Sequence, residues 1–351
     1  MLKGIFGKRT VVVLFSLTIL AGFVFTLAPN AFSADKVYEW NFSLWGGKRA
    51  WSAPLHDWAA DMLKKTNGRW KIKLHYGGVL APPKENWDGI KAGMFEAAGI
   101  CNAYTGTGKG PLHSVSELPF IAPNENKDII QMMVELWKHP ALKKELLKWN
   151  AVPLLPSALC QYHLMGNRAI RTVKDLDGAR IRIGGEIAKV LKQFGAVPTL
   201  VPAPEVYEAI SRGTVDLAGF PWTYGFGAFK TYEVSKYVSL PMSLGTMSCF
   251  YIANKDAWDA LPAEFKKYHM EWYYKSPDIW AAEFKKADDK WIPIFKKTLE
   301  FIDFPKSERN KLVAKAEGVY ERWVEAREKE GLPGREILNY YLKKRKEITG
   351  D

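Results

Sequence analysis

The sequence contains few cysteines, and they do not form a recognisable motif. Cys101, Cys160 and Cys249 are the three cysteines among 351 residues, and each lies in an apolar stretch. Their number and wide spacing exclude a small disulfide-dense scaffold and the usual zinc and redox motifs. One long-range disulfide is possible in an oxidising compartment, but the apolar surroundings favour buried free thiols.

Catalytic motifs are also missing. The chain has no Gly-x-Ser-x-Gly sequence, its six histidines are isolated from one another, and its acidic residues show no paired spacing. These patterns carry most nucleophilic and metal-dependent hydrolysis. We therefore expect a protein that is not an enzyme and that has no cofactor and no metal. The alternative is a secreted enzyme whose site is assembled from distant segments.

Long apolar runs are absent after the first 33 residues. A transmembrane helix needs about 20 apolar residues, and only residues 11–27 approach that length. Basic residues precede this run, and Ala31-Phe32-Ser33 follows it with small residues at both positions of a cleavage site. A signal anchor is the competing interpretation, but this ending favours a signal peptide over residues 1–33. No cysteine follows the run, so we expect an exported protein, located in the periplasm, with no membrane anchor after cleavage.

The charge does not indicate a nucleic-acid partner. The formal net charge is +12, and it falls to +9 without the three basic residues of the expected signal peptide. The lysines alternate with acids, as in residues 285–290 and 341–347, which is typical of solvated helix faces. Hydrophobic content of 47% and charged content of 25% are those of a globular protein. We expect no nucleic-acid binding.

Strand and helix patterns alternate along the rest of the chain. Residues 37–44, 70–76 and 95–103 have strand patterns, and a helical pattern covers residues 53–66 between the first two. This alternation predicts an α/β fold with mixed, mostly parallel sheets flanked by helices. Further helices are expected at residues 127–149 and at 277–299, the latter long enough to span two lobes.

Two segments of the chain resemble each other. Ile90-Lys-Ala-Gly-Met-Phe-Glu-Ala-Ala-Gly99 aligns without gaps on Ile210-Ser-Arg-Gly-Thr-Val-Asp-Leu-Ala-Gly219. In each, a helix ends at a glycine, an acid follows three residues later, and a strand of small residues comes next. Two copies exclude a solenoid and favour two similar α/β lobes that face each other across a cleft, unless the similarity arises by chance.

The strand around Arg182 and several loop aromatics are the strongest candidates for ligand binding. Arg182 ends a strand just before Gly184 and Gly185, where an arginine can hold a carboxylate through two parallel hydrogen bonds. A solvated edge-strand arginine is the alternative. Trp45, Trp51, Tyr104, Phe220, Trp222 and Tyr224 lie in loops at strand ends, where α/β sheets bind ligands.

Short motifs in a fixed order connect the chain to a known family. They include Thr66-Asn-Gly-Arg69, Glu117-Leu-Pro-Phe120, Asp175-Leu-Asp-Gly-Ala-Arg-Ile-Arg182, Gly195-Ala-Val-Pro198, Pro204-Glu-Val-Tyr207, Gly213-Thr-Val-Asp216 and Tyr232-Glu-Val-Ser-Lys-Tyr237. With this order and spacing, residues 35–345 resemble the DctP-like substrate-binding proteins of tripartite ATP-independent periplasmic (TRAP) transporters. The resemblance implies a two-lobed periplasmic-binding-protein fold, an organic-acid ligand and a membrane permease as partner.

The resemblance also implies positions for the lobes and for the ligand contacts. Lobe I is expected at residues 34–159 and 246–285, and lobe II at 160–245 and 286–351. Arg182 occupies the position of the family arginine that pairs with the ligand carboxylate. The full set of expected contacts is Arg182, Phe220, Trp222, Gln161, Tyr162, Tyr104, Asn102, Trp45, Trp51 and Gly185.

Departures from known branches of this family bear on the ligand. The sialic-acid branch has a further arginine where this chain has Gln161-Tyr162, whereas the 2-oxoacid branch has a glutamine there, like Gln161. That second branch also holds a metal through acids, but Gly219-Phe-Pro-Trp222 offers none. One arginine among aromatic residues predicts a monocarboxylate with an apolar or aromatic body.

The role of the protein has an alternative too. Instead of a transport receptor, it could be a sensor-type binding module that binds a solute and passes a signal to a receptor.

Overall fold

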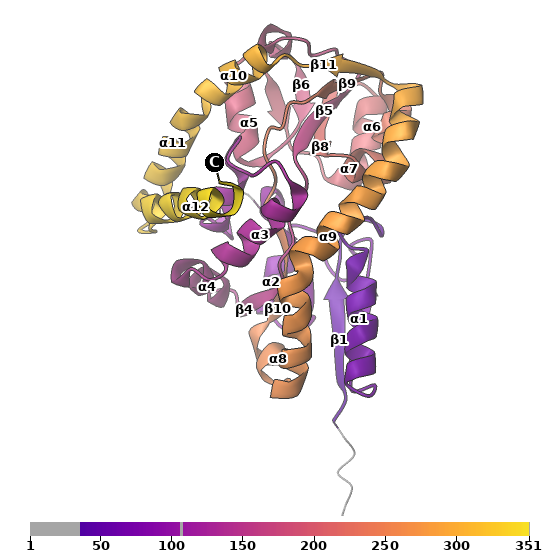
Figure 1. Cartoon of the computed structure of the whole chain (residues 1–351), viewed down its shortest axis with the longest axis vertical. Coiled ribbons are helices and arrows are strands. Elements are labelled where there is room, and N and C mark those ends of the chain that lie inside the picture. Colours follow the sequence, from indigo (N-terminus) through magenta and orange to yellow (C-terminus); the bar gives the residue numbers. More distant parts are fainter. Residues whose placement is uncertain (1–35, 106–107, 351) are drawn as a thin grey trace, which may run out of the picture. The chain divides into compact units, whose positions relative to one another are not determined.

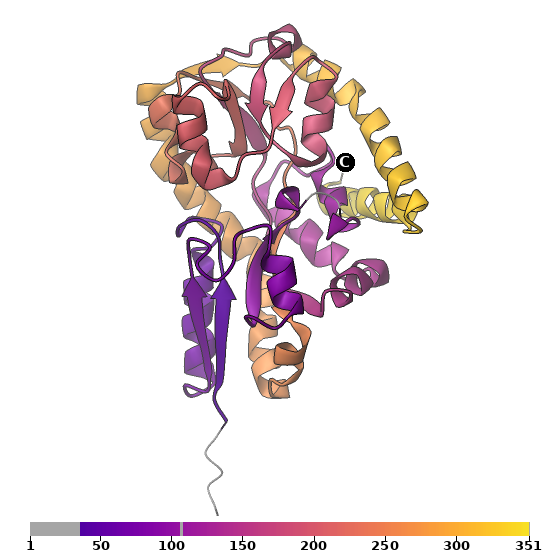
Figure 2. The same cartoon turned by 180° about the vertical axis from the view of Figure 1, so that it is seen from behind.

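The computed structural model describes residues 36–105 and 108–350 of the protein (Figures 1 and 2). The expected signal peptide, residues 1–33, lies outside the described residues. Among the helices that are described, none has the length and apolar character needed to cross a membrane.

The first sheet has five strands in the order β2-β1-β3-β10-β4. Their bounds are β1 (Tyr38–Ser43), β2 (Trp70–His75), β3 (Ala97–Cys101), β4 (Ala151–Leu155) and β10 (Cys249–Asn254). The strand patterns at residues 37–44, 70–76 and 95–103 correspond to β1, β2 and β3. β1 runs parallel to β2 and β3, whereas β10 runs antiparallel to β3 and β4.

The second sheet has six strands in the order β11-β9-β5-β8-β6-β7. They are β5 (Tyr162–Gly166), β6 (Arg180–Arg182), β7 (Val197–Thr199), β8 (Leu217–Pro221), β9 (Tyr237–Leu240) and β11 (Glu300–Asp303). β5 is antiparallel to both β8 and β9, and the other described pairings are parallel. The expected two-lobed α/β fold with mixed sheets is confirmed.

Antiparallel pairing is more frequent than the strand–helix alternation predicts. β5 and β10 are the strands through which the chain passes from one sheet to the other, by segments 156–161 and 241–248. These short connections contain no helix. Both strands run antiparallel to their neighbours within the sheet they enter.

Short helices flank each sheet. They are α1 (Pro54–Lys65), α2 (Asn86–Lys91), α3 (Asn126–Leu136), α4 (Pro140–Leu147) and α8 (Lys255–Asp259) in the first lobe, and α5 (Gly185–Lys192), α6 (Val206–Ser211) and α7 (Tyr224–Ala228) in the second. The single helix expected at residues 127–149 is wrong, because it divides into α3 and α4. Pro140 explains the break, since proline disfavours helical backbone in the residue before it.

One long helix, α9 (Ala263–Thr298), crosses from the first lobe to the second (Figure 1). It packs against α1 and α3 of the first lobe and against α7 of the second. The expected start near residue 277 is wrong, because Pro277 lies inside the helix. Proline removes one backbone hydrogen bond, but the buried side chains of Phe265, Trp280 and Phe284 hold the flanking turns against the protein.

The two similar sequence segments have the same local structure. α2 and β3 form the first copy, and α6 and β8 form the second. In both, the glycine after the helix has left-handed backbone, with φ of 68° at Gly93 and 66° at Gly213. Such φ angles strain residues that carry a Cβ, which explains why both copies have glycine there.

The C-terminal helices connect the lobes a second time. They are α10 (Lys306–Ala314), α11 (Ala316–Lys329) and α12 (Gly334–Thr349). α11 packs against α5, whereas α12 packs against α3 (Figures 1 and 2). This end of the chain is therefore shared between the two sheets.

Two of the cysteines form a disulfide. Cys101 on β3 and Cys249 on β10 are directly opposite each other and are bonded, whereas Cys160 is a buried free thiol. The expectation of free thiols is wrong for this pair. The two residues are 148 positions apart in the sequence, so only the return of β10 beside β3 brings them together.

Candidate ligand-binding pocket

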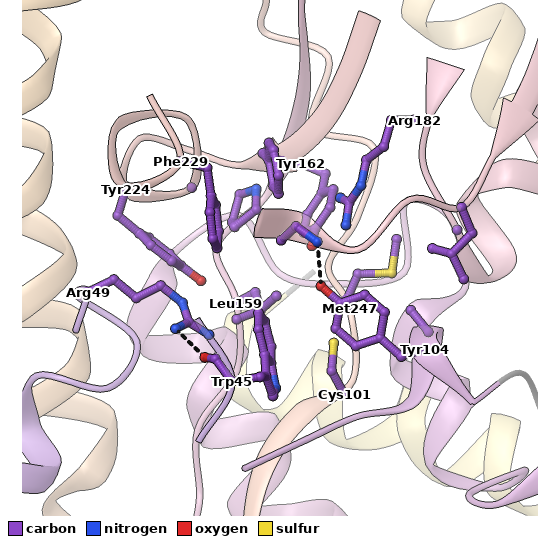
Figure 3. Close-up of a pocket in the computed structure, with 17 residues that line it drawn as sticks. Trp45, Arg49, Cys101, Tyr104, Leu159, Tyr162, Arg182, Tyr224, Phe229 and Met247 are labelled. Carbon is purple, nitrogen blue, oxygen red and sulfur yellow. Dashed lines mark hydrogen bonds between the residues drawn. The ribbon is translucent and has the colours of Figure 1, made fainter. Parts of the chain in front are cut away.

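A pocket lies where loops of the two sheets meet (Figure 3). Its walls come from the β1–α1 loop, the end of β3, the ends of β6 and β8, and the segment before β10. Its cavity volume is only about 30 Å³, room for one or two water molecules, so a larger ligand requires the lining side chains or the lobes to move apart. The carboxyl ends of the parallel strands β1, β3, β6 and β8 thus converge on one site, as is typical of ligand sites in α/β proteins.

Arg182 is held rigidly in this pocket. It is 5% exposed, its Nε donates to the carbonyl of Val201 at 2.8 Å, and its Nη1 donates to the carbonyl of Gly219 at 3.1 Å. Its guanidinium lies over the Phe220 ring, 4.5 Å from the centroid. Among the described residues it forms no ion pair with an acid and makes no hydrogen bond through Nη2. The alternative interpretation, a solvated arginine on an edge strand, describes Arg180 and not Arg182. Arg180 pairs with Asp216 at the surface.

Aromatic rings form most of the remaining wall. The edge of Tyr104 meets Trp45 at 5.2 Å between centroids, and Phe220 stacks on Phe229 at 5.3 Å. The Tyr104 hydroxyl accepts a hydrogen bond from the backbone of Ala203 at 3.3 Å, which joins the two lobes (Figure 3). The pocket therefore combines a fixed cation with apolar ring surfaces.

Two phenols also line the pocket, those of Tyr162 and Tyr224. Burial raises the pKa of both groups, and it does so more strongly than the charges of Arg182 near Tyr162 and of Arg49 near Tyr224 lower it. Both phenols are thus neutral at physiological pH and can donate a hydrogen bond to a ligand.

Five of the ten expected contact residues line the pocket, namely Arg182, Phe220, Tyr162, Tyr104 and Trp45. Gln161 and Asn102 lie outside its lining because their amides bond to the protein itself. The Gln161 side chain donates to the carbonyls of Ala122 and Pro123 and accepts from the backbone of Gly245, while Asn102 donates to Gly110.

Trp51, Trp222 and Gly185 also lie outside the lining. Trp51 stacks on Tyr251 in the core, and Trp222 packs against Phe295 of α9. Gly185, with φ of 62°, instead gives space to the carboxyl of Glu117, because a Cβ there would lie 2.6 Å from its Oε2. The residue before it, Gly184, is the glycine in the pocket wall.

The sequence interpretation missed Arg49, which lines the pocket from the β1–α1 loop. It is 7% exposed, and its Nη1 donates to the carbonyls of Trp45 and Gly47, both at 2.9 Å. The only signal in the sequence is its position between Trp45 and Trp51, in a loop after the first strand.

Metal ligands are not clustered in the described part of the chain. The described residues contain no group of three or more His, Cys, Asp or Glu side chains that could hold an ion.

Glu117, buried next to the pocket residue Met247, should make stability depend on pH. Burial raises the pKa of its carboxyl from 4.5 to about 8, although the Ser248 backbone donates to it at 3.1 Å. Between these values the folded protein keeps a proton that the unfolded chain releases, so stability falls as pH rises through this window. We expect the melting temperature of wild type to fall from pH 5 to pH 8 relative to that of Glu117→Gln.

Thermal unfolding of both proteins across this range tests the expectation. The comparison with Glu117→Gln cancels the opposite contribution of buried histidines such as His163, whose pKa burial lowers to about 3. Parallel pH profiles for the two proteins would show that Glu117 is ionised in the fold.

Comparison with known proteins places the chain in a family. Residues 45–327 match the model of the bacterial extracellular solute-binding protein family 7, DctP. A monocarboxylate 2-oxoacid-binding periplasmic protein of a Nostoc species is 27% identical over 218 residues, which is 60% of this chain and 57% of the relative. The match thus spans little more than half of that relative's length.

Solved structures share the fold. A marine metagenome TRAP solute-binding protein specific for aromatic acid ligands, in complex with 3-hydroxybenzoate, superposes with a TM-score of 0.79 at 20% identity, over 90% of this chain and 99% of that one. A TRAP protein of Rhodoferax ferrireducens with copurified benzoate gives 0.78 at 22% identity, over 89% and 98%. One of a Sulfitobacter species with galacturonate gives 0.74 at 20%, over 87% and 99%.

The family model covers most of the chain, and the fold of these structures agrees with it. The motif order that resembles DctP-like proteins is explained by common descent with them. The chain belongs to the DctP family, family 7 of the bacterial extracellular solute-binding proteins.

Proposed function

We propose that the protein is the solute receptor of a TRAP transporter and binds an aromatic monocarboxylate in the pocket through Arg182. The observation that carries this proposal is a buried arginine among aromatic rings that has no acid partner within the described part of the chain. A buried charge without a counter-ion is costly to fold. An anionic ligand removes that cost by supplying the missing charge.

The chemistry of Arg182 suits a carboxylate. Its Nε and Nη1 are occupied by backbone carbonyls, which fix the plane of the guanidinium and leave Nη2 to donate to a ligand. The nearby Tyr162 phenol is a second donor. Closure of the lobes excludes water from the site and strengthens such a charge pair, because the effective dielectric constant falls.

The walls of the pocket favour a flat apolar body over a sugar acid. Among the described lining residues, Trp45, Tyr104, Phe220 and Phe229 offer ring faces, and no asparagine, glutamine, aspartate or glutamate is present to satisfy several hydroxyl groups. Burying an unpaired hydroxyl is unfavourable. Two of the similar solved proteins hold benzoate or 3-hydroxybenzoate, which is consistent with this class.

Location and partner follow from the family assignment as parts of the proposal. The receptor acts in the periplasm after cleavage of residues 1–33 and delivers its ligand to a membrane permease. Its lobes are residues 34–159 with 246–285, and 160–245 with 286–351, and α12 of the second lobe reaches across to α3 of the first. The two strand connections and α9 act as the hinge.

Ligand binding by the exported protein is the direct test. We expect benzoate and related aromatic monocarboxylates to raise its melting temperature, because a ligand at 100 times its dissociation constant adds about 2.7 kcal/mol of stability. Galacturonate, succinate and sialate are the comparison ligands. Calorimetric titration then gives the dissociation constants.

The opposite selectivity would contradict the proposal. If galacturonate or succinate stabilises the protein and no aromatic monocarboxylate does, the ligand class is wrong. Recovery of a chemically changed ligand after incubation would favour the enzyme alternative over a receptor.

A further inference from the structure

Arg49 is a second buried cation in the pocket without an anionic partner. Its Nη2 is buried and has no hydrogen-bond partner in the structure, and no described residue forms an ion pair with it. Burial lowers the pKa of its guanidinium, but arginine stays charged in proteins. A charged donor that is withdrawn from water and left unpaired is unfavourable, so this position calls for an acceptor that the protein itself does not supply.

The surroundings of Arg49 fix its direction. The guanidinium carbon lies 4.2 Å from the Trp45 ring, 4.9 Å from the Trp51 ring and 5.8 Å from the Phe229 ring. Gly46 allows this packing, because a Cβ there would lie 3.1 Å from Nη1 of Arg49. Both Nη1 bonds go to the carbonyls of its own loop, so Nη2 is the free donor of a rigid group.

Arg49 and Arg182 reach the pocket from opposite sides (Figure 3). Arg49 comes from the first lobe and Arg182 from the second. The Tyr224 hydroxyl points toward Arg49 and also has no hydrogen-bond partner in the structure. No aspartate or glutamate is among the described lining residues, so one carboxylate leaves one of the two positive charges uncompensated.

We propose that Arg49 and Tyr224 form a second polar subsite, which binds an oxygen substituent on the aromatic ring at the end away from the carboxylate. This inference rests on the proposed function, since it takes Arg182 as the carboxylate anchor. The ligand class is an aromatic acid that carries a second acceptor. A ring hydroxyl keeps the ligand a monocarboxylate, as proposed above, whereas a second carboxylate would widen the proposed class to aromatic dicarboxylates. A carboxylate matches the two cations in charge, whereas a hydroxyl accepts from Arg49 and Tyr224 without balancing the charge.

The position of Arg49 also gives it a part in specificity. An unsubstituted ring leaves Nη2 and the Tyr224 hydroxyl unpaired in a closed pocket, and a site built from such donors discriminates against ligands that lack the acceptor. Because Arg49 and Arg182 lie on different lobes, a ligand that pairs with both holds the lobes together at its two ends.

The test compares ligands that differ only in the second substituent. Dissociation constants of benzoate, 3-hydroxybenzoate and isophthalate are measured by calorimetry for the exported wild type and for Tyr224→Phe, Arg49→Lys and Arg49→Met. Lys48→Met is the matched control, because it removes the same charge from the neighbouring residue, which is exposed. Tyr224→Phe deletes only a hydroxyl without a partner, so it should preserve the fold.

We expect wild type to bind at least one substituted acid more tightly than benzoate. Arg49→Met should remove about 10- to 100-fold of affinity for that acid, and Tyr224→Phe about 3- to 10-fold. Both variants should change benzoate binding much less, Arg49→Lys should restore part of the loss, and Lys48→Met should change none of the constants.

Equal losses for benzoate and for the substituted acids would overturn the subsite and leave Arg49 as a loop-stabilising residue, with the proposed function intact. A wild type that binds benzoate but gains nothing from either substituent would overturn it too. If no aromatic acid binds to wild type, the proposed function and the subsite fall together.

Discussion

Arg182→Met is expected to lose aromatic-acid binding by a factor of about 150 to 4,000. Removing one partner of a buried charge pair costs about 3–5 kcal/mol, and each 1.4 kcal/mol corresponds to a tenfold change in the dissociation constant. The ligand carboxylate would enter the pocket without its fixed cation, beside Phe220 and Tyr162. Calorimetric titration of wild type and variant with the same acid measures the effect.

A matched control is available two residues earlier on the same strand. Arg180 is exposed and pairs with Asp216 at the surface, so Arg180→Met changes the net charge equally without touching the pocket. It should bind the acid as wild type does.

The Arg182 side chain also donates to the carbonyls of Val201 and Gly219, so Arg182→Met can lose stability as well as binding. Arg182→Lys keeps the charge and serves as a second variant. Its affinity for the acid should be intermediate, because a single ammonium cannot reproduce the planar fork of donors. Folded Arg182→Met protein with wild-type affinity would show that the carboxylate is held elsewhere in the site.

Removing the disulfide is expected to lower the free energy of unfolding more than the other substitutions described. The bond between Cys101 and Cys249 closes a loop of 148 residues in the unfolded chain. Cross-links over such long loops stabilise proteins mainly by restricting the unfolded state, by about 2–5 kcal/mol. We expect the double variant Cys101→Ala/Cys249→Ala to unfold at correspondingly lower urea concentration than wild type.

The third cysteine provides the control for this experiment. Cys160→Ala removes a buried thiol that closes no loop. It should leave only a small cavity, which lowers the free energy of unfolding by about 1 kcal/mol. Reductant should lower the stability of wild type and leave that of the double variant unchanged. Equal stability of wild type and the double variant, or three free thiols in the oxidised protein by mass spectrometry, would contradict the bond.

Local sequence patterns were sufficient to predict the strands β1, β2 and β3. In β1 and β2 the side chains alternate between a more buried and a more exposed face, a period of two that the residue types show directly. β3 is buried throughout and was recognised as a short apolar run. The sequence also predicted that Gly93 and Gly213 end helices, because left-handed backbone after a helix favours glycine. The limits of helices were less secure: Pro140 ends one helix, whereas Pro277 lies inside another, and only packing distinguishes these cases.

The pocket was predictable in part. Arg182 and Phe220 lie at the ends of strands that the sequence shows, and such ends meet at one edge of a sheet. Trp51 and Trp222 occur in equally good positions, yet their rings turn into the core and toward α9. Side-chain direction at a strand end depends on neighbours that are distant in the sequence, so residue type and position alone do not separate these tryptophans from Trp45.

The sequence by itself determined the family, the two-lobed α/β class and Arg182 as the candidate carboxylate anchor, because motif order and residue periodicity are local properties of the chain. Only the tertiary structure decided that Cys101 meets Cys249, that Gln161 bonds to backbone carbonyls instead of facing the pocket, and that Arg49 opposes Arg182. Each of these depends on contacts between the two sheets or across them, where residues many tens of positions apart become neighbours. Chain crossings between the lobes create those contacts, and no short stretch of sequence contains them.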